Sequence, residues 1–133
     1  MSEVFADTYY FLALLAPADE GHAAAVAASR TLPARLVTTA WVLVEVADAL
    51  SGSATRLRGA GFIEDLERKP MFLVLPGSRE SFQAGLELYR SRPDKEWSLT
   101  DCISFVVMKE RGIKEALTGD HHFEQAGFTA LLT

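Results

Sequence analysis

The chain has 133 residues, of which 49% are hydrophobic and 23% are charged. This length fits one compact domain with a buried core, and this composition excludes a disordered chain. The net charge of −5 counts against a broad basic surface for nucleic acid, and no apolar stretch approaches the roughly 20 residues needed to cross a bilayer.

Short apolar runs typical of strands alternate along the chain with longer helical patterns. Strands are predicted over residues 4–6, 36–38, 71–75, 116–118 and 128–132. Helices are predicted over residues 8–16, 19–30, 40–50, 53–69, 78–90 and 100–111. The alternation predicts a three-layer α/β/α sandwich around a mostly parallel sheet of about five strands. Because no linker or repeat interrupts it, we expect residues 1–133 to form a single domain.

Two details refine the expected helices. In the helix over residues 78–90, an apolar stripe is supplied by Phe82, Leu86 and Tyr89 at helical spacing. The helix over residues 100–111 is followed by Gly112, a residue favoured just past a helix C-terminus.

Four carboxylates lie where burial would make them costly. Asp7 follows an apolar strand, Glu45 lies within an apolar helix, Asp101 opens a helix and Asp120 closes a strand region. A desolvated carboxylate is unfavourable unless it is paired, hydrogen-bonded or bound to a metal. In open α/β sheets, ligands bind at the carboxyl ends of the strands, where residues such as Asp7 and Asp120 fall. Oxygen ligands without a matching Cys/His set indicate Mg²⁺ or Mn²⁺ rather than zinc.

Each acid also has a simpler interpretation. Asp7 and Asp120 could cap the helices that follow them, since Asp is a favoured N-cap residue. The stretch from Ser98 to Asp101 resembles a capping box, with Asp101 reaching back. Glu45 is the hardest to explain this way, because it lies beside the apolar face of its helix.

The other reactive side chains give weaker indications of a functional site. His121 and His122 are adjacent on a predicted helix and should point in different directions, so we interpret them as surface or helix-end residues rather than a ligand pair. Trp97 is interpreted as a packing residue near enough to Asp101 to line a cleft. Cys102 is the single cysteine and is expected to be a small core residue. Together with an acidic N-terminus unlike a signal peptide, the lone cysteine favours a reducing, cytoplasmic setting.

Four segments of the chain resemble motifs of the PIN-domain family. They are VFADT at residues 4–8, Thr38-Thr39 followed by Glu45, the segment over residues 94–105 and LTGDHHF at residues 117–123. The resemblance runs almost from end to end in order and spacing. Many relatives carry Asn where this chain has Gly119, which removes a possible hydrogen bond but no ligand.

The resemblance implies a function. Single-domain bacterial members of this size are similar to VapC-type toxins, which are Mg²⁺- or Mn²⁺-dependent endoribonucleases of toxin–antitoxin pairs. It maps the family's four acids onto Asp7, Glu45, Asp101 and Asp120, and a hydroxyl onto Thr118. It implies that the first three hold the principal ion and that Asp120 binds directly or through water, with Thr118 behind the ligands. It further implies an RNA substrate, an antitoxin partner and a homodimer.

Two alternatives differ in class. A non-catalytic PIN-fold module that binds RNA or protein would be expected to lack one or more acids, whereas all four are present. A receiver-like phosphoacceptor domain would need a paired acidic cluster early in the chain and a late Lys after a strand, which this sequence does not show. RNA approaching an acidic site needs cations on its rim, and Arg90, Arg92 and Lys95 precede Asp101 by about one loop.

Overall fold

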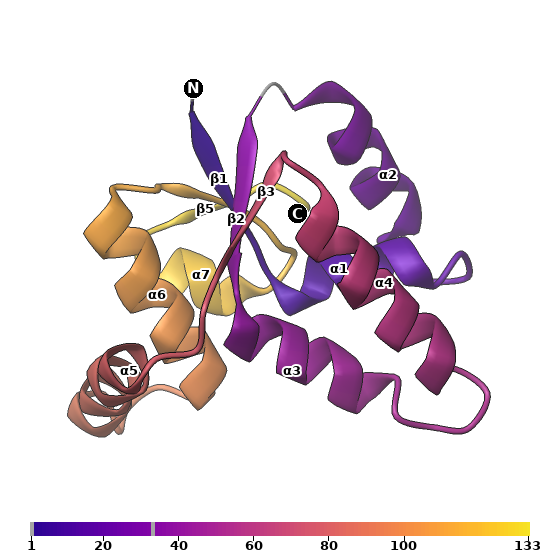
Figure 1. Cartoon of the computed structure of the whole chain (residues 1–133). Coiled ribbons are helices and arrows are strands. Elements are labelled where there is room, and N and C mark those ends of the chain that lie inside the picture. The colour runs from indigo at the N-terminus through magenta and orange to yellow at the C-terminus, as the bar shows by residue number, and fades with distance from the viewer. Residues whose placement is uncertain (1, 33) are drawn as a thin grey trace.

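The computed structural model describes residues 2–32 and 34–133, and its centre is a five-stranded sheet in which all strands run parallel. The strands are β1 (Glu3–Ala6), β2 (Arg35–Thr39), β3 (Phe72–Leu75), β4 (Glu115–Leu117) and β5 (Thr129–Ala130). They are ordered β3-β2-β1-β4-β5, so β1 lies at the centre (Figure 1). In register, Phe5 pairs with Val37 on one side and with Ala116 on the other. The predicted α/β sandwich with a parallel five-stranded sheet is confirmed.

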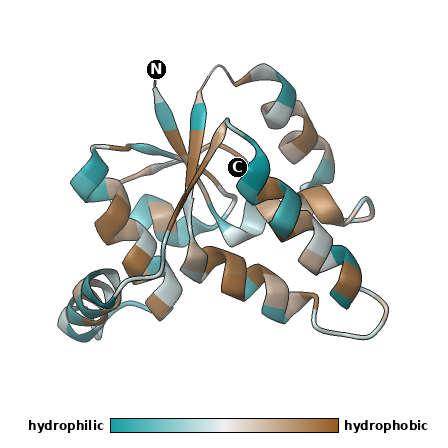
Figure 2. Ribbon diagram, in the orientation of Figure 1, coloured by the Kyte–Doolittle hydropathy of each residue, from teal (hydrophilic) through white to brown (hydrophobic). Residues whose placement is uncertain are grey.

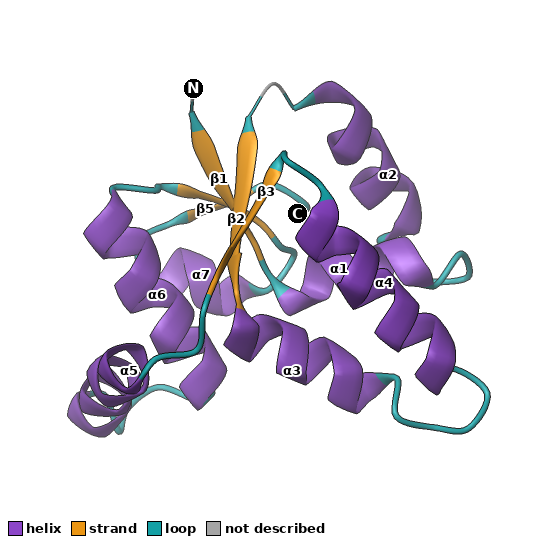
Figure 3. Cartoon of the chain, viewed as in Figure 1, coloured by secondary structure: helices purple, strands orange, loops and turns teal. Residues whose placement is uncertain are grey.

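Seven helices are found in the described chain (Figure 3). They are α1 (Thr8–Leu15), α2 (His22–Thr31), α3 (Ala40–Ala49), α4 (Arg56–Arg68), α5 (Arg79–Ser91), α6 (Leu99–Arg111) and α7 (His121–Gln125). Figure 1 shows α1 to α4 on one side of the sheet and α5 to α7 on the other. The chain moves outward from β1 to β3 and then crosses back to β4, which places the later helices on the opposite face.

The predicted helix boundaries shift at two places. The helix predicted from residue 19 begins at His22, because the Asp19 carboxylate accepts a hydrogen bond from the Gly21 amide and closes a turn. The helix predicted from residue 53 begins at Arg56, after a turn in which the Thr55 amide donates to the Gly52 carbonyl. Gly112 ends α6 in the left-handed conformation, with φ 69°, as predicted.

The core lies between the sheet and its two helical layers. Phe5, Val37 and Leu117 of the three central strands are fully buried, and Phe11 and Phe123 cover them from opposite sides. The strands are largely hydrophobic along their length (Figure 2). This two-sided burial is what a parallel sheet requires. Cys102 is buried in this core, as expected, and its burial raises the pKa of the thiol to about 11.

The packing of α5 corrects one expectation. Tyr89 of the predicted apolar stripe is 51% exposed, and α5 packs against α6 through Gly85 instead. A Cβ atom on Gly85 would lie 2.2 Å from Cγ1 of Ile103, so the absence of a side chain there allows the two helices to approach. Phe82 does pack, with its ring 5.9 Å from that of Trp41. This close approach fixes the position of α6, the helix that carries Asp101.

None of the helices in the described part of the chain is both long enough and apolar enough to span a bilayer.

Candidate functional site

The carboxyl edge of the sheet brings Asp7 and Thr118 together. Asp7 follows β1 and Thr118 follows β4, and the last residues of these two strands pair as Ala6 with Leu117. The Thr118 hydroxyl donates a 2.9 Å hydrogen bond to Oδ2 of Asp7 and accepts one of 3.0 Å from the backbone amide of Asp120. Thr118 therefore links the first acid to the segment that bears the fourth.

Asp7 is a buried carboxylate in an unfavourable environment. It occupies the N-cap position of α1, but its side chain makes no capping hydrogen bond, so capping does not explain it. Only 4% of the residue is exposed. Burial raises its pKa to about 7, the Thr118 hydrogen bond opposes that rise, and the nearby charges of Asp101 and Glu45 add to it. Asp7 thus lies within the electrostatic reach of two of the other acids.

Glu45 reaches the same edge from α3. This helix begins directly after β2, where the Thr39 hydroxyl accepts a hydrogen bond from the Val42 amide as its N-cap. The Thr8 hydroxyl donates a 2.5 Å hydrogen bond to Oε1 of Glu45. Since Thr8 follows Asp7 in the chain, this bond holds the half-buried Glu45 beside the first acid.

Asp101 is held by the capping box predicted at the start of α6. Its amide donates to the Ser98 hydroxyl, and its Oδ2 accepts from the Ser98 amide at 3.1 Å. The capping interpretation of Asp101 is therefore confirmed, yet the residue is also 8% exposed and close to the other acids. Burial raises its pKa, the Ser98 amide lowers it, and the negative charge of Asp120 raises it further.

Asp120 and His122 complete the group, and His122 corrects the sequence interpretation. Asp120 caps α7 by accepting a 2.9 Å hydrogen bond from the His122 amide, as predicted. The Nδ1 atom of His122 lies 3.2 Å from Oδ2 of Asp101 and 3.4 Å from Oδ1 of Asp120. His122 is therefore part of the site rather than a surface residue, because the first turn of a short helix directs its imidazole back toward the capping carboxylate.

His121 remains at the surface, as expected. Its side chain is 72% exposed, although its Nδ1 atom lies 3.7 Å from Oδ1 of Asp120. Asp120, His121 and His122 each offer a ligand atom within 4.8 Å of the other two, so the conclusion that the two histidines cannot belong to one ligand set was wrong. Within the described chain, no such group of three ligand atoms, all within 4.8 Å of one another, includes Asp7, Glu45 or Asp101.

The donor set fits a hard divalent cation. The four acids supply carboxylate oxygens, and in the described chain no Lys or Arg lies within 4 Å of any of them. Two of them, Asp7 and Asp101, are nearly fully buried with raised pKa values. A bound cation would supply the positive charge that these carboxylates lack.

Gly119 has a clear structural reason. A Cβ atom at this position would lie 2.6 Å from Cζ and 2.7 Å from the hydroxyl of Tyr9. The Tyr9 ring therefore occupies the space next to the backbone between Thr118 and Asp120, and any side chain at Gly119 would displace it.

Comparisons with known proteins agree with this architecture. The family model of the PIN domain matches residues 4–129. The chain is similar to the crystal structure of Mycobacterium tuberculosis VapC20, described as a sarcin–ricin loop cleaving toxin, with 26% identity, a TM-score of 0.86, and coverage of 94% of this chain and 95% of that one. It also shares its fold with FitAcB from Neisseria gonorrhoeae, at 18% identity and a TM-score of 0.66, with 96% and 94% covered. A search of curated proteins found no match.

Proposed function

Because this chain belongs to the PIN domain family, we propose that it is a divalent-metal-dependent endoribonuclease, and that it acts as the toxin of a toxin–antitoxin pair. The observation that carries the proposal is the pair Asp7 and Asp101, two buried carboxylates with raised pKa values beside further acids and, among the described residues, without Lys or Arg partners within 4 Å. The description of the VapC20 neighbour as a sarcin–ricin loop cleaving toxin supports the choice of RNA. We take residues 1–133 to be one domain, in line with the reach of the family match.

Each residue then has a role. Asp7, Glu45 and Asp101 hold a Mg²⁺ or Mn²⁺ ion, and Asp120 binds it directly or through water. The Thr118 hydroxyl orients the Asp7 carboxylate through its hydrogen bond. When bound, such an ion polarises a phosphoryl oxygen and lowers the pKa of a bound water.

His122 is added to this set as a positioning residue. Its imidazole lies between the carboxylates of Asp101, in α6, and Asp120, the N-cap residue of α7. It therefore fixes the distance between α6 and the start of α7 at the site. Its side chain is 19% exposed, against 72% for His121, so it is better placed than His121 to do so.

Cleavage of a panel of RNAs tests the proposal. Wild-type protein with Mg²⁺ or Mn²⁺ should cleave, and Asp7→Asn should lose at least about a hundredfold in rate, as expected when a metal ligand or its support is removed. Asp48→Asn, an exposed acid one turn from Glu45, is the matched control and should cleave as wild type. Equal cleavage by wild type and Asp7→Asn would contradict the proposal, and RNA binding without cleavage would make the protein a non-catalytic module.

We also propose protein partners, an antitoxin and a second copy of this chain. Two large apolar residues support this, Val44 on α3 at 54% exposure and Leu57 on α4 at 84%. Phe62 and Ile63 on α4 are not available for such contacts, because they pack against the core. Sedimentation at micromolar concentration tests the dimer, and inhibition of cleavage by a co-expressed polypeptide from a neighbouring gene tests the antitoxin.

The buried, free Cys102 fits the reducing cytoplasm, where we propose the protein acts.

A further inference from the structure

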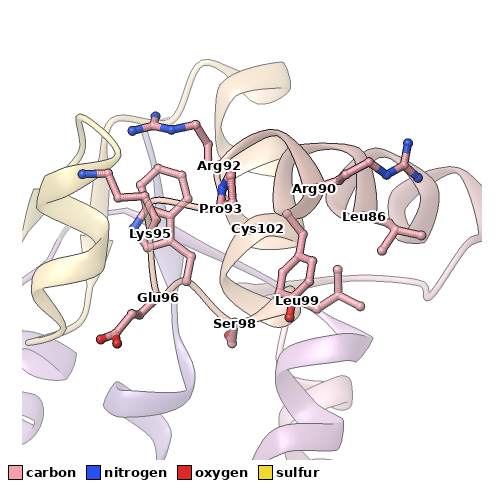
Figure 4. A pocket seen from close by; sticks show the side chains of 11 residues that line it. Leu86, Arg90, Arg92, Pro93, Lys95, Glu96, Ser98, Leu99 and Cys102 are labelled. Carbon is pink, nitrogen blue, oxygen red and sulfur yellow. The ribbon is translucent and has the colours of Figure 1, made fainter.

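A groove beside the acids has a composition unlike the rest of this acidic chain. It lies between α5, the loop over residues 92–98 and the start of α6, and has a volume of about 940 Å³. Its wall combines three cations, two aromatic rings and apolar side chains (Figure 4). We propose that this groove binds a single-stranded segment of RNA and leads it to the carboxylates, an inference that rests on the proposed function.

One of the two aromatic residues of the groove, Tyr89, is exposed enough for a base to stack on it. Tyr89 is 51% exposed at the end of α5, where a packed helix would normally bury such a residue. Leu86 and Leu99 lie in the same wall, so the ring stands in an apolar setting. An exposed aromatic face in a cationic groove suits an unpaired base, because every base has a π face and a duplex keeps its bases stacked within the helix.

The cations of the groove differ in availability. Arg92 donates two hydrogen bonds to Asp94, at 3.0 and 2.9 Å, and its guanidinium lies 5.2 Å from the centre of the Trp97 ring. It therefore shapes the loop rather than meeting a phosphate. Lys95 forms no ion pair within 4 Å in the described chain and lies 6.0 Å from the centre of the Trp97 ring, and Arg90 has only an exposed 3.4 Å pair with Glu87. These two cations are the ones free to contact phosphates.

The positions of these charged residues connect the groove to the acidic site. Figure 4 shows Arg90 on one side and Lys95 on the other, with the carboxylate of Glu96 pointing away from the Lys95 amine. Lys95 and Glu96 also line a second, polar hollow that is bordered by His122. Since His122 contacts both Asp101 and Asp120, a strand lying in the groove passes directly to the acidic site.

The charge pattern favours RNA over a second copy of this chain. The exposed apolar residues proposed above for a second copy, Val44 and Leu57, lie on α3 and α4, on the other side of the sheet from α5 (Figure 1). The groove presents cations and an exposed ring in a pattern that matches a polyanion with planar bases. A second copy covering Tyr89 remains the outcome that the experiment must separate.

Binding measured without metal tests the inference independently of cleavage. The probe is a fluorescent 12-nucleotide single-stranded RNA, titrated in EDTA by anisotropy with wild type, Tyr89→Ala, Tyr89→Phe, Lys95→Ala and Lys114→Ala. Tyr89→Ala should weaken binding by about tenfold, while Tyr89→Phe keeps the ring and binds as wild type. Lys95→Ala should reduce the slope of log affinity against log salt by about one. Lys114, an exposed lysine preceding β4 at the opposite edge of the sheet, is the control and should change little.

Three results would overturn the proposal that this groove binds single-stranded RNA. Wild-type affinity in both Tyr89→Ala and Lys95→Ala would remove the groove from the RNA path while leaving cleavage, and hence the proposed function, intact. Equal affinity for the same RNA annealed to its complement would remove the stacking role. A wild-type dimer that Tyr89→Ala converts to monomer in sedimentation would assign the groove to a second copy. Conversely, groove-dependent binding by a protein that cleaves nothing would contradict the proposed function alone.

Discussion

The Thr118 hydroxyl donates a 2.9 Å hydrogen bond to the Asp7 carboxylate, joining the ends of two neighbouring parallel strands. Both residues are nearly inaccessible to solvent, Thr118 at 0% and Asp7 at 4%. The same hydroxyl accepts the Asp120 amide. One side chain therefore satisfies a buried acid and fixes the loop that carries a second.

This arrangement predicts that Thr118→Val weakens both stability and cleavage. Valine has nearly the same shape but leaves the Asp7 carboxylate and the Asp120 amide without their partner, which costs about 1–3 kcal/mol. Cleavage should fall about 10–100-fold, as for other residues that orient a metal ligand. Thr118→Ser retains the hydroxyl and serves as the matched control. Urea unfolding and RNA cleavage measure the two effects, and a valine variant equal to the serine variant in both would contradict the assignment.

The raised pKa of Asp7 predicts how stability depends on pH. In the metal-free folded protein the carboxyl group has a pKa of about 7, whereas its ordinary value is 3.8. Between these values the folded state binds the proton and the unfolded state has released it, so stability falls as pH rises from about 4 to 7. Asp101 shifts in the same direction.

Urea unfolding in EDTA between pH 5 and pH 8 checks this dependence. Wild type should be more stable at pH 5, with a slope of at most about 1.4 kcal/mol per pH unit for one group. Asp7→Asn cannot titrate and should show a shallower slope. Parallel slopes in the two proteins would show that Asp7 does not carry the effect.

If the acids share a cation, wild type and Asp101→Asn should differ in thermal stability with and without the ion. Removing one of several mutually repelling carboxylates should leave the fold intact and raise the melting temperature in EDTA. Mg²⁺ or Mn²⁺ should then stabilise wild type by mass action and the variant much less. Thermal unfolding with and without each ion measures both effects. Equal ion-induced shifts would argue against a site that includes Asp101.

The placement of the acids was predictable from the sequence because it depends on local order. An acid directly after a strand lies at the carboxyl edge of a parallel sheet, which places Asp7 and Asp120 without further information. Ser98 and Asp101 form a capping box that can be read over four residues. The structure adds how Glu45 is held, since its partner Thr8 lies 37 residues away in the chain.

The role of His122 and the packing of Gly85 could not be predicted in this way. The helical rule that adjacent residues diverge fails for His122, because it lies in the first turn of a five-residue helix with its ring centroid 4.5 Å from that of His121. The contact of Gly85 with Ile103 depends on the distance between two helices, which no spacing within α5 reveals. Because α5 approaches α6 through Gly85, Tyr89 lies outside the interface between these two helices.

Two helical glycines, Gly85 in the α5–α6 contact and Gly61 on α4, should respond in opposite ways to replacement by alanine. Gly85→Ala would place a Cβ 2.2 Å from Cγ1 of Ile103 and 3.1 Å from its Cα, so one of the helices must shift. Overpacking of this kind costs about 1–3 kcal/mol. Gly61→Ala within α4 meets nothing within 4 Å and should stabilise by about 0.5–1 kcal/mol through the helix propensity of alanine. Urea unfolding compares them, and equal effects would contradict this packing.

The last prediction concerns the bond that joins α6 and α7. The Trp97 indole N–H donates a 3.0 Å hydrogen bond to the Gln125 side chain, and its ring packs edge-on against Phe105 at 5.1 Å. Trp97 precedes α6, which carries Asp101, while Gln125 ends α7, which begins at His121 and contains His122. The bond should therefore hold the contact between His122 and Asp101.

A double-mutant cycle tests this link. Trp97→Phe keeps an aromatic ring without the donor, and Gln125→Ala removes the acceptor. If the hydrogen bond couples them, the double variant should lose less stability than the sum of the single losses, by about 1 kcal/mol. All three variants should lower kcat of RNA cleavage more than they change KM, because the carboxylates shift while an aromatic ring remains at position 97 in the groove wall. Strictly additive stabilities together with unchanged kcat would show that the bond only packs the surface and that His122 holds the two helices alone.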